Sequence, residues 1–173
     1  MLLALLLIPL MAVGPVQPPS EAQVRAGLVY NFASFTEWPD PTPAERPLVI
    51  GVLGNDAVAK ALKATGKLGN GRDIDVRIVT QGEGLSECQV LYVSAISDRA
   101  VAATLARVST MPVLTVGEHE RFTQLGGIIR VYPDGNRLKF EVDIAHATSV
   151  RLKISSRVLD LARVVRDSDA PNP

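Results

Sequence analysis

The feature that most constrains the fold is a run of apolar residues without the alternation of a half-exposed strand. Residues 48–53 read Leu-Val-Ile-Gly-Val-Leu, and such a continuous run predicts a strand covered on both faces. The next residues, Gly54-Asn55-Asp56, provide a turn into a predicted helix over residues 57–64. A strand followed by a helix is half of a β-α-β unit, so this segment predicts a parallel sheet with helices packed on it.

The same alternation of strand and helix recurs further along the chain. Apolar patterns predict strands at residues 74–79, 90–93 and 111–116, and a helix over residues 98–108. The first of these strands has alternating apolar and charged residues, namely Ile74, Val76 and Ile78 against Asp75 and Arg77. This alternation predicts one wet face, and therefore a position near an edge of the sheet.

After Gly117 the pattern changes to two strands that follow each other directly. Residues 128–132 and 137–142 are joined only by Pro133-Asp134-Gly135-Asn136, which predicts an antiparallel hairpin. The second strand has its apolar residues on one face and its charged residues on the other, with Leu138, Phe140 and Val142 opposed to Lys139 and Glu141. We therefore expect the hairpin to pack by one face.

Two helices are predicted after the hairpin. Asp143 caps a short helix to about residue 150, and a last helix starts near Ser156. The apolar side of this last helix is formed by Val158, Leu161, Ala162 and Val165. The predicted fold class is α/β: a single three-layer-like domain with a mixed sheet, in which βα repeats are followed by an antiparallel hairpin and C-terminal helices.

Length and charge narrow the functions to consider. With 173 residues, the chain is long enough for one domain with a sizeable core. Its 18 basic and 18 acidic residues cancel, which removes the electrostatic footprint of a nucleic-acid-binding protein or a polybasic membrane-binding protein. We therefore expect no nucleic-acid partner and no direct membrane binding by the folded domain.

The N-terminus has the character of an export signal. Its apolar run, residues 1–13, is shorter than the roughly twenty residues that a membrane-spanning helix needs, and it fits a secretory signal better. Cleavage is predicted after Ala22, with Ser20 at the minus-three position, whereas the alternative of a buried helix is weakened by Pro9 and Pro15. We predict a signal peptide over residues 1–22, an α/β domain over 23–166 and a disordered tail over 167–173.

Half of the eight aromatic residues lie within the nine residues from Tyr30 to Trp38. Ser20 and Gln23 have the spacing of a capping box, so a helix is predicted over residues 21–35, and Pro39 favours extended geometry at Trp38. The apolar stripe of this helix is formed by Val24, Leu28, Phe32 and Phe35. Because aromatic residues dominate interfaces as well as cores, we predict a partner-binding region at Tyr30, Asn31, Phe35 and Trp38.

Residues that could carry catalysis or hold a metal do not form a recognised pattern. Glu118-His119-Glu120 could bind a metal weakly, but no second histidine lies at a useful spacing. Asp143 and His146 fit a helix cap and a surface histidine better than an acid-base pair. We predict no metal site at either place.

Phosphate-binding and nucleophile patterns are also incomplete. Gly51-Val52-Leu53-Gly54 lacks the third glycine of a nucleotide-binding turn, and Gly66-Lys67 lacks the residues around it that a phosphate loop needs. Ser155 and Ser156 fit a helix N-cap better than a pair with Lys153. We therefore predict that the chain is not an enzyme and needs no cofactor.

Cys88 is the only cysteine, so the chain cannot form an internal disulfide. Its neighbours are mostly apolar, and the sequence shows no histidine or helix N-terminus that would lower the pKa of its thiol. We interpret Cys88 as a free thiol that is buried as a small apolar residue.

Several spaced motifs resemble the YfiR family of bacterial periplasmic proteins from about Ala22 to Val165. The motifs are Tyr30-Asn31-Phe32 with Phe35 and Trp38-Pro39, Asn70-Gly71-Arg72, Cys88-Gln89-Val90-Leu91-Tyr92, Pro112-Val113-Leu114-Thr115-Val116, Gly126-Gly127, Phe140-Glu141-Val142, and Leu152-Lys153-Ile154-Ser155-Ser156 with Leu159 and Leu161-Ala162. Their common order makes the resemblance more specific than any single motif.

The resemblance implies an exported, non-enzymatic regulator in the periplasm. Such a protein binds and represses the periplasmic sensor domain of a membrane-anchored diguanylate cyclase or similar signalling protein, and so affects cyclic di-GMP and biofilm growth. Family members often have a cysteine near the position of Gly51 that can bridge to the position of Cys88. Because this chain has Gly51 there, redox control through that bridge is not expected.

Two further interpretations remain open from the sequence. One is a periplasmic small-molecule sensor, with its ligand at the carboxyl ends of the parallel strands near Gly54-Asn55 and Gly117-Glu118. The other is that the chain assembles as a homodimer, alone or beside its partner in the inner membrane.

Overall fold

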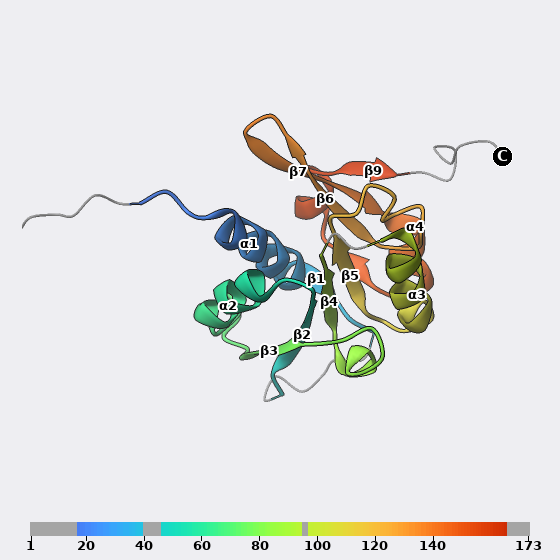
Figure 1. The fold of residues 1–173 in the computed structure, drawn as a ribbon, viewed down its shortest axis with the longest axis horizontal. Coiled ribbons are helices and arrows are strands. Elements are labelled where there is room, and N and C mark those ends of the chain that lie inside the picture. The colour runs from blue at the N-terminus through green and yellow to red at the C-terminus, as the bar shows by residue number, and fades with distance from the viewer. Residues whose placement is uncertain (1–16, 40–45, 95–96, 166–173) are drawn as a thin grey trace, which may run out of the picture.

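A mixed sheet of seven strands is the centre of the computed structural model, which describes residues 17–39, 46–94 and 97–165. The strand order is β3-β2-β4-β5-β6-β7-β9 (Figure 1). The strands are β2 (Leu48–Leu53), β3 (Ile74–Ile78), β4 (Val90–Val93), β5 (Leu114–Gly117), β6 (Ile129–Asp134), β7 (Arg137–Asp143) and β9 (Arg163–Val165). The helices are α1 (Glu21–Ser34), α2 (Asp56–Thr65), α3 (Asp98–Val108), α4 (Ile144–Ser149) and α5 (Ser156–Leu159), with a short 3₁₀ helix, η1 (Leu85–Glu87).

The topology follows the predicted succession of βα repeats and hairpin. Strands β3, β2, β4, β5 and β6 run parallel to their neighbours, and β6 and β7 form the antiparallel hairpin. The hairpin projects beyond the body of the molecule (Figure 1). Strand β3 lies at an edge of the sheet, as its alternating sequence predicts. The α/β fold class is therefore confirmed.

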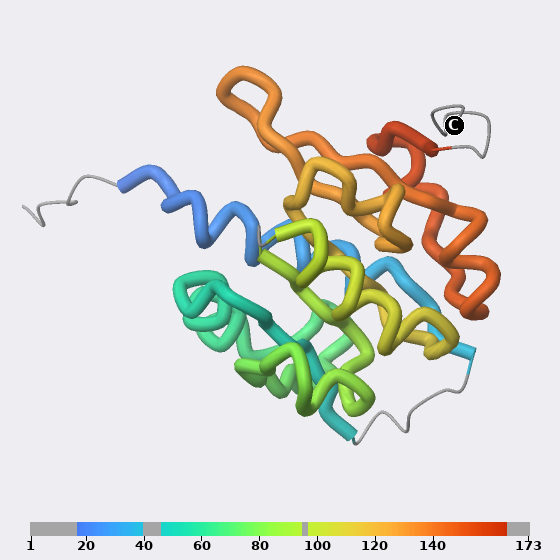
Figure 2. The backbone as a smooth tube through the Cα atoms, turned by 45° about the vertical axis from the view of Figure 1, so that its right-hand side comes forward, coloured from blue at the N-terminus to red at the C-terminus, as the bar shows by residue number. Residues whose placement is uncertain are grey.

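Each face of the sheet is covered by its own hydrophobic cluster. One cluster joins the sheet to residues of α1, α2, α4 and α5, and α1 and α2 lie side by side in both views (Figures 1 and 2). The other cluster joins the opposite face to α3, η1 and Phe122. Burial on two sides explains why the β2 sequence is apolar without alternation.

Helix α1 begins at the predicted capping box. The Ser20 hydroxyl accepts a hydrogen bond from the Gln23 amide at 3.3 Å, and the Gln23 side chain accepts one from the Ser20 amide at 2.7 Å. The predicted apolar stripe is partly wrong, because Val24 is 39% and Phe35 is 36% exposed. Helix α1 ends at Ser34, so helical periodicity no longer determines the direction of Phe35. The residues that α1 buries are Ala26, Val29, Phe32 and Ala33.

The predicted last helix is wrong beyond its first turn. Helix α5 has only four residues, and the chain then forms β9, which pairs in parallel with β7 through Glu141↔Arg163 and Asp143↔Val165. Leu161, expected on an apolar helix face, is 78% exposed. The strand forms because the β7 edge offers unpaired backbone groups, and β-branched valines suit a strand.

Two strand side chains differ from their predicted exposure, since Glu141 is buried and Ile78 is exposed. Glu141 is only 6% exposed, because Thr123 covers it and donates a hydrogen bond to its carboxylate at 3.0 Å. Ile78 is 59% exposed, although Val76 on the same face is buried. The α1–α2 layer reaches Val76 but not the end of this edge strand.

The segment that covers Glu141 is held by an aromatic ring between two glycines. Phe122 is fully buried, and a Cβ atom added at Gly117 or Gly127 would lie 2.2 Å from its ring. No side chain fits at either glycine without displacing the ring. The sequence analysis did not identify this packing, because the three residues are brought together only by the fold.

Some predicted boundaries fall outside the described residues. These are most of the signal peptide over residues 1–22 and the tail over 167–173. The predicted cleavage after Ala22 would remove Ser20 and with it the cap of α1. These boundaries remain predictions.

Arg151 ends helix α4 in a conformation that favours glycine. Its φ is 62°, and it occupies the left-handed position of a Schellman motif in which Leu152 N donates to Ala147 O and Arg151 N donates to Thr148 O, both at 2.9 Å. A residue with a Cβ atom is strained there.

We expect Arg151→Gly to raise the free energy of unfolding by about 0.5–1 kcal/mol, because glycine relieves this strain and keeps both backbone hydrogen bonds. Urea unfolding followed by circular dichroism measures the change. Arg151→Ala is the control and should show no gain, since it removes the guanidinium but retains the Cβ atom. Equal stabilisation by both substitutions would contradict the strain argument.

Gly51 on β2 lies directly against Cys88. A Cβ atom at position 51 would lie 2.5 Å from Cys88 Sγ and 3.3 Å from Leu91 Cδ1. The two positions therefore face each other, in agreement with the bridge that the family resemblance implies for relatives with a cysteine in β2.

We expect Gly51→Ala to lower the free energy of unfolding by about 1–3 kcal/mol through overpacking. Cys88→Ala removes the nearest obstructing atom. The double variant should therefore lose less free energy of unfolding than the sum of the losses in the two single variants. Chemical unfolding of the wild type, both single variants and the double variant provides the test. Strictly additive losses would show that the two positions do not compete for space.

Candidate functional site

The end of α1 leads directly into a small ribbon formed by segments far apart in the sequence. Strand β1 (Thr36–Glu37) pairs antiparallel with β8 (Lys153–Ile154), with Thr36 opposite Ile154 and Glu37 opposite Lys153. The Thr36 hydroxyl donates to Phe32 O at 2.8 Å, and the Ser155 amide donates to Phe35 O at 2.9 Å. These bonds fix the ribbon to both the last turn of α1 and the start of α5.

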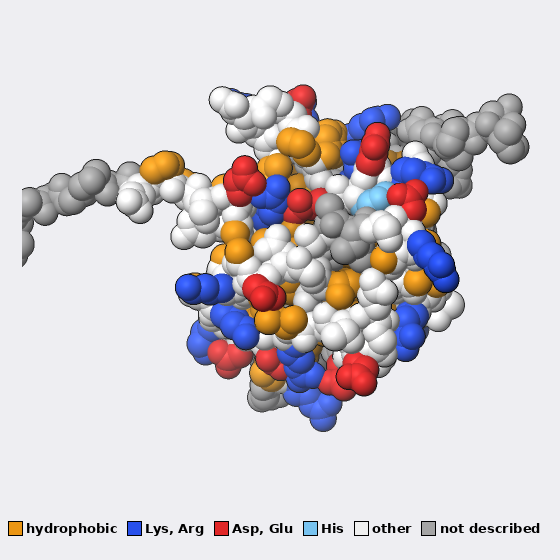
Figure 3. Space-filling model, viewed as in Figure 1, with side chains coloured by type: hydrophobic (Ala, Val, Ile, Leu, Met, Phe, Trp, Pro, Cys, Tyr) orange, Lys and Arg blue, Asp and Glu red, His pale blue; other side chains and the backbone are white. Residues whose placement is uncertain are grey.

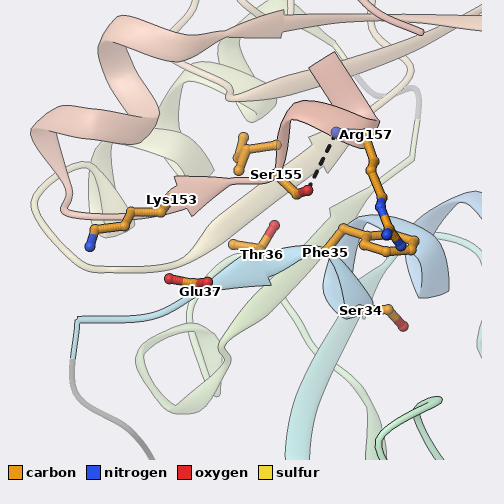
Figure 4. A pocket seen from close by; sticks show the side chains of 8 residues that line it. Ser34, Phe35, Thr36, Glu37, Lys153, Ser155 and Arg157 are labelled. Carbon is orange, nitrogen blue, oxygen red and sulfur yellow. Dashed lines mark hydrogen bonds between the residues drawn. The ribbon is translucent and has the colours of Figure 1, made fainter. Parts of the chain in front are cut away.

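A hollow of about 440 Å³ lies over this ribbon. Phe35 and Arg157 are at one end, with the guanidinium carbon 6.0 Å from the ring centroid, which is within cation–π range. Glu37 and Lys153 extend together at the other end (Figure 4). The hollow is also lined by Ser34, Thr36, Ile154 and Ser155.

A second hollow, of about 530 Å³, shares Lys153 and Ile154 with the first. Its lining is mostly apolar and includes Ile144 and Leu159, with the cationic side chain of Arg151 among them. We use the term ribbon surface for Phe35, Glu37, Arg151, Lys153, Ile154, Arg157 and Leu159. This surface combines one mostly polar hollow that contains Phe35 and Ile154, one mostly apolar hollow, and exposed cations.

The four residues of the predicted partner-binding region do not share one surface. Phe35 and Asn31 are exposed, and Phe35 is part of the ribbon surface. Tyr30 and Trp38 are half-buried and pack against the main core. Trp38 donates its indole N–H to Gln89 O at 3.3 Å and lines a separate hollow of about 200 Å³ beside Cys88.

The sequence analysis did not assign a role to the cations of the ribbon surface. Lys153 lies between the apolar residues Leu152 and Ile154, and its side chain is exposed. A local signal was present, because residues 151–163 contain four basic side chains and one acidic side chain in a chain that is neutral as a whole. Phe35 lies more than 100 residues before these cations, so the sequence pattern alone does not show that the two parts share one surface.

The Cys88 thiol is not arranged as a reactive group. It is 3% exposed and donates to Gly84 O at 3.2 Å. Burial raises the pKa of the thiol, and the nearby charge of Arg77 only partly opposes this effect. The thiol is therefore protonated at neutral pH, which agrees with its interpretation as a small buried residue.

The polar groups at the carboxyl ends of the strands already have partners within the chain. Glu118 accepts hydrogen bonds from Arg25 Nε at 2.7 Å and from the Tyr92 hydroxyl. Burial raises the pKa of Tyr92, and the Glu118 carboxylate raises it further, so the phenol is protonated and donates. Burial disfavours the Arg25 cation, but Glu21 and Glu118 together outweigh this effect and raise the pKa of Arg25. Asn55 caps α2 through Val58 N.

His119, Asp143 and Ser155, which were considered as candidate site residues, have structural roles. His119 contacts Asp98 at 2.9 Å and accepts from the Arg121 amide at 3.2 Å. Asp143 caps α4, and Ser155 caps α5. No group of three or more His, Cys, Asp or Glu side chains suited to a metal occurs in the described part of the chain. Over the same residues, no helix combines the length and apolar character needed to cross a membrane.

Comparison with solved structures supports the fold. A crystal structure of a conserved domain protein from Vibrio cholerae O1 biovar El Tor matches with a TM-score of 0.60 and 13% sequence identity. The match covers 85% of this chain, and the chain spans 60% of the length of the Vibrio protein. At this identity the likeness extends to the fold alone.

Comparisons of sequence identify the family. A search among curated proteins finds no match. A model of the YfiR/HmsC-like family matches residues 22–163, which extend from the second residue of α1 to the first residue of β9. The chain belongs to the YfiR/HmsC-like family.

Proposed function

We propose that this protein is a periplasmic regulator that binds and represses the sensor domain of a membrane-anchored diguanylate cyclase or similar signalling protein. Membership of the YfiR/HmsC-like family over residues 22–163 is the observation that carries the proposal. The proposal includes export directed by residues 1–22, an α/β domain over residues 23–166 and action by binding without catalysis. The buried, protonated Cys88 thiol and the contact of His119 with Asp98 are consistent with a binding role.

The proposed contact region is the ribbon surface, with Asn31 beside it on α1. Phe35 is the aromatic residue of the predicted cluster that combines exposure with a place in a hollow. Tyr30 and Trp38 support this region from within, since both pack against the main core. Exposed aromatic side chains over a rigid base are typical anchors of protein interfaces.

Repression requires the protein to distinguish two states of its partner. A ligand that binds both states equally shifts no equilibrium, whereas a shift from mostly active to mostly inactive needs about 5 kcal/mol of difference in binding free energy. We infer that the ribbon surface fits the inactive arrangement of the sensor domain. Asn55 and Glu118, the polar residues expected to hold a ligand near Gly54 and Gly117, already have partners within the chain, so no specific observation favours the small-molecule sensor.

Deletion of the gene is expected to raise cellular cyclic di-GMP, because the partner would lose its repressor. The measurement is extraction and mass spectrometry of cyclic di-GMP from the deletion strain and from the strain complemented with the wild-type gene. Unchanged cyclic di-GMP after deletion would contradict the proposal.

Complementation with Phe35→Ser is expected to leave cyclic di-GMP high, because the variant removes the apolar anchor without changing the core. Val24→Ser is the matched control, since Val24 is an equally exposed apolar residue on α1 outside the ribbon surface. Both variants should accumulate and unfold like the wild type. Full repression by the Phe35→Ser variant would show that Phe35 is not part of the interface.

A further inference from the structure

We propose that the ribbon surface binds an acidic, amphipathic segment of the partner, whose apolar side chains enter the two hollows while its carboxylates meet Arg151, Lys153 and Arg157. This inference rests on the proposed function and specifies the chemistry of the partner. It concerns one continuous segment of a protein, because the two hollows are adjacent and share Lys153 and Ile154.

The charge of the ribbon surface carries the first part of the inference. Arg151, Lys153 and Arg157 are all exposed, and no carboxylate among the residues with described coordinates lies within 4.0 Å of their charged groups. Even Glu37, which faces Lys153 across the ribbon, does not reach that distance. The ribbon surface as defined above therefore contains three cationic side chains and one carboxylate, that of Glu37.

This grouping differs from the arrangement of four other exposed cations of the molecule, whereas Lys60 and Lys63 on α2 resemble it in having no carboxylate within 4.0 Å among the described residues. Lys67, Arg77, Arg121 and Lys139 each pair with an aspartate or glutamate nearby. On the face drawn in Figure 3, basic and acidic side chains are interspersed. Cations that are grouped and lack acidic neighbours attract a surface of opposite charge and guide its approach.

The apolar lining carries the second part. Phe35 is 36% exposed at one end of the first hollow, and Ile144, Ile154 and Leu159 line the second. A cavity of about 150 Å³ is enough for benzene, so each hollow has room for a large side chain. Purely acidic segments would leave these apolar residues exposed, which favours an amphipathic one.

A membrane surface fits these features less well than a protein segment. Regions that bind anionic lipid usually have four to eight clustered cations, whereas the ribbon surface has three and also carries Glu37. Its hollows are concave, which suits inserted side chains better than a flat layer of headgroups. The two occupants remain separable by experiment.

The binding test uses the purified mature protein and fluorescent synthetic peptides. The first probe alternates Glu or Asp with Leu or Phe, the second replaces each acid by Lys, and the third replaces each apolar residue by Ser. We expect the first probe to bind about tenfold or more tightly than either of the others, and its affinity to fall as salt increases. Fluorescence anisotropy measures each affinity at low and physiological salt.

Charge reversal identifies the surface. Lys153→Glu combined with Arg157→Glu should weaken binding of the acidic amphipathic probe by about tenfold or more, since attraction becomes repulsion. Lys60→Glu combined with Lys63→Glu makes the same charge change on exposed positions of α2 and should leave binding unchanged. Thermal unfolding verifies that both variants fold. Equal binding of the acidic and basic probes, or unchanged binding by the Lys153/Arg157 variant, would overturn the inference.

Two further measurements separate alternative occupants and separate this inference from the proposed function. If the protein binds phosphatidylglycerol vesicles but not the acidic probe, the ribbon surface is a lipid-binding surface. If the Lys153/Arg157 variant loses self-association and the Lys60/Lys63 variant does not, the ribbon surface binds a second copy of the chain. The cellular test uses a strain in which deletion of the gene raises cyclic di-GMP. Full repression by the Lys153/Arg157 variant in that strain would refute the role of the ribbon surface and leave the proposed function intact. Unchanged cyclic di-GMP after deletion would refute the function itself.

Discussion

The carboxylate of Glu118 connects helix α1 to the sheet, and the last turn of that helix leads into the ribbon surface. Glu118 follows β5 and accepts from Arg25 of α1 and from the buried Tyr92 of β4. Ion pairs that are largely buried add little net stability, because desolvation offsets the attraction, but they penalise other arrangements strongly. We interpret this cluster as fixing the direction of α1, whose last turn leads into β1 and thereby places Phe35.

The need to cover both faces of the central strands accounts for much of the remaining architecture. On one face, α1 and α2 provide the cover, and on the other α3 is supplemented by the segment that includes Phe122. The Phe122 ring lies so close to Gly117 and Gly127 that neither position has space for a side chain. The same segment brings Thr123 over Glu141, which allows a charged residue to be buried with hydrogen bonds.

Local pattern was sufficient to predict most of the fold but not its long-range contacts. The strands and helices between Leu48 and Val108 follow from apolar runs, turn residues and caps that lie close together in the sequence. Strand β9 could not be predicted in the same way, because Arg163–Val165 forms a strand only beside β7. The burial of Glu141 likewise depends on Thr123, far from it in the chain. The periodicity of apolar residues gives information about a single strand or helix, whereas the formation of β9 and the burial of Glu141 each depend on contact between two segments.

The candidate site shows the same division more sharply. The aromatic cluster directed attention to the C-terminal end of α1, and of its aromatic members Phe35 is the one that reaches the ribbon surface. The complementary cations come from the segment around β8, and pairing of Thr36 with Ile154 is what brings the two halves together. A mobile loop would lose entropy on ordering around a partner. Here the ribbon is fixed by backbone hydrogen bonds to α1 and α5, so a partner segment would meet a surface already arranged for binding, and this favours control by contact alone.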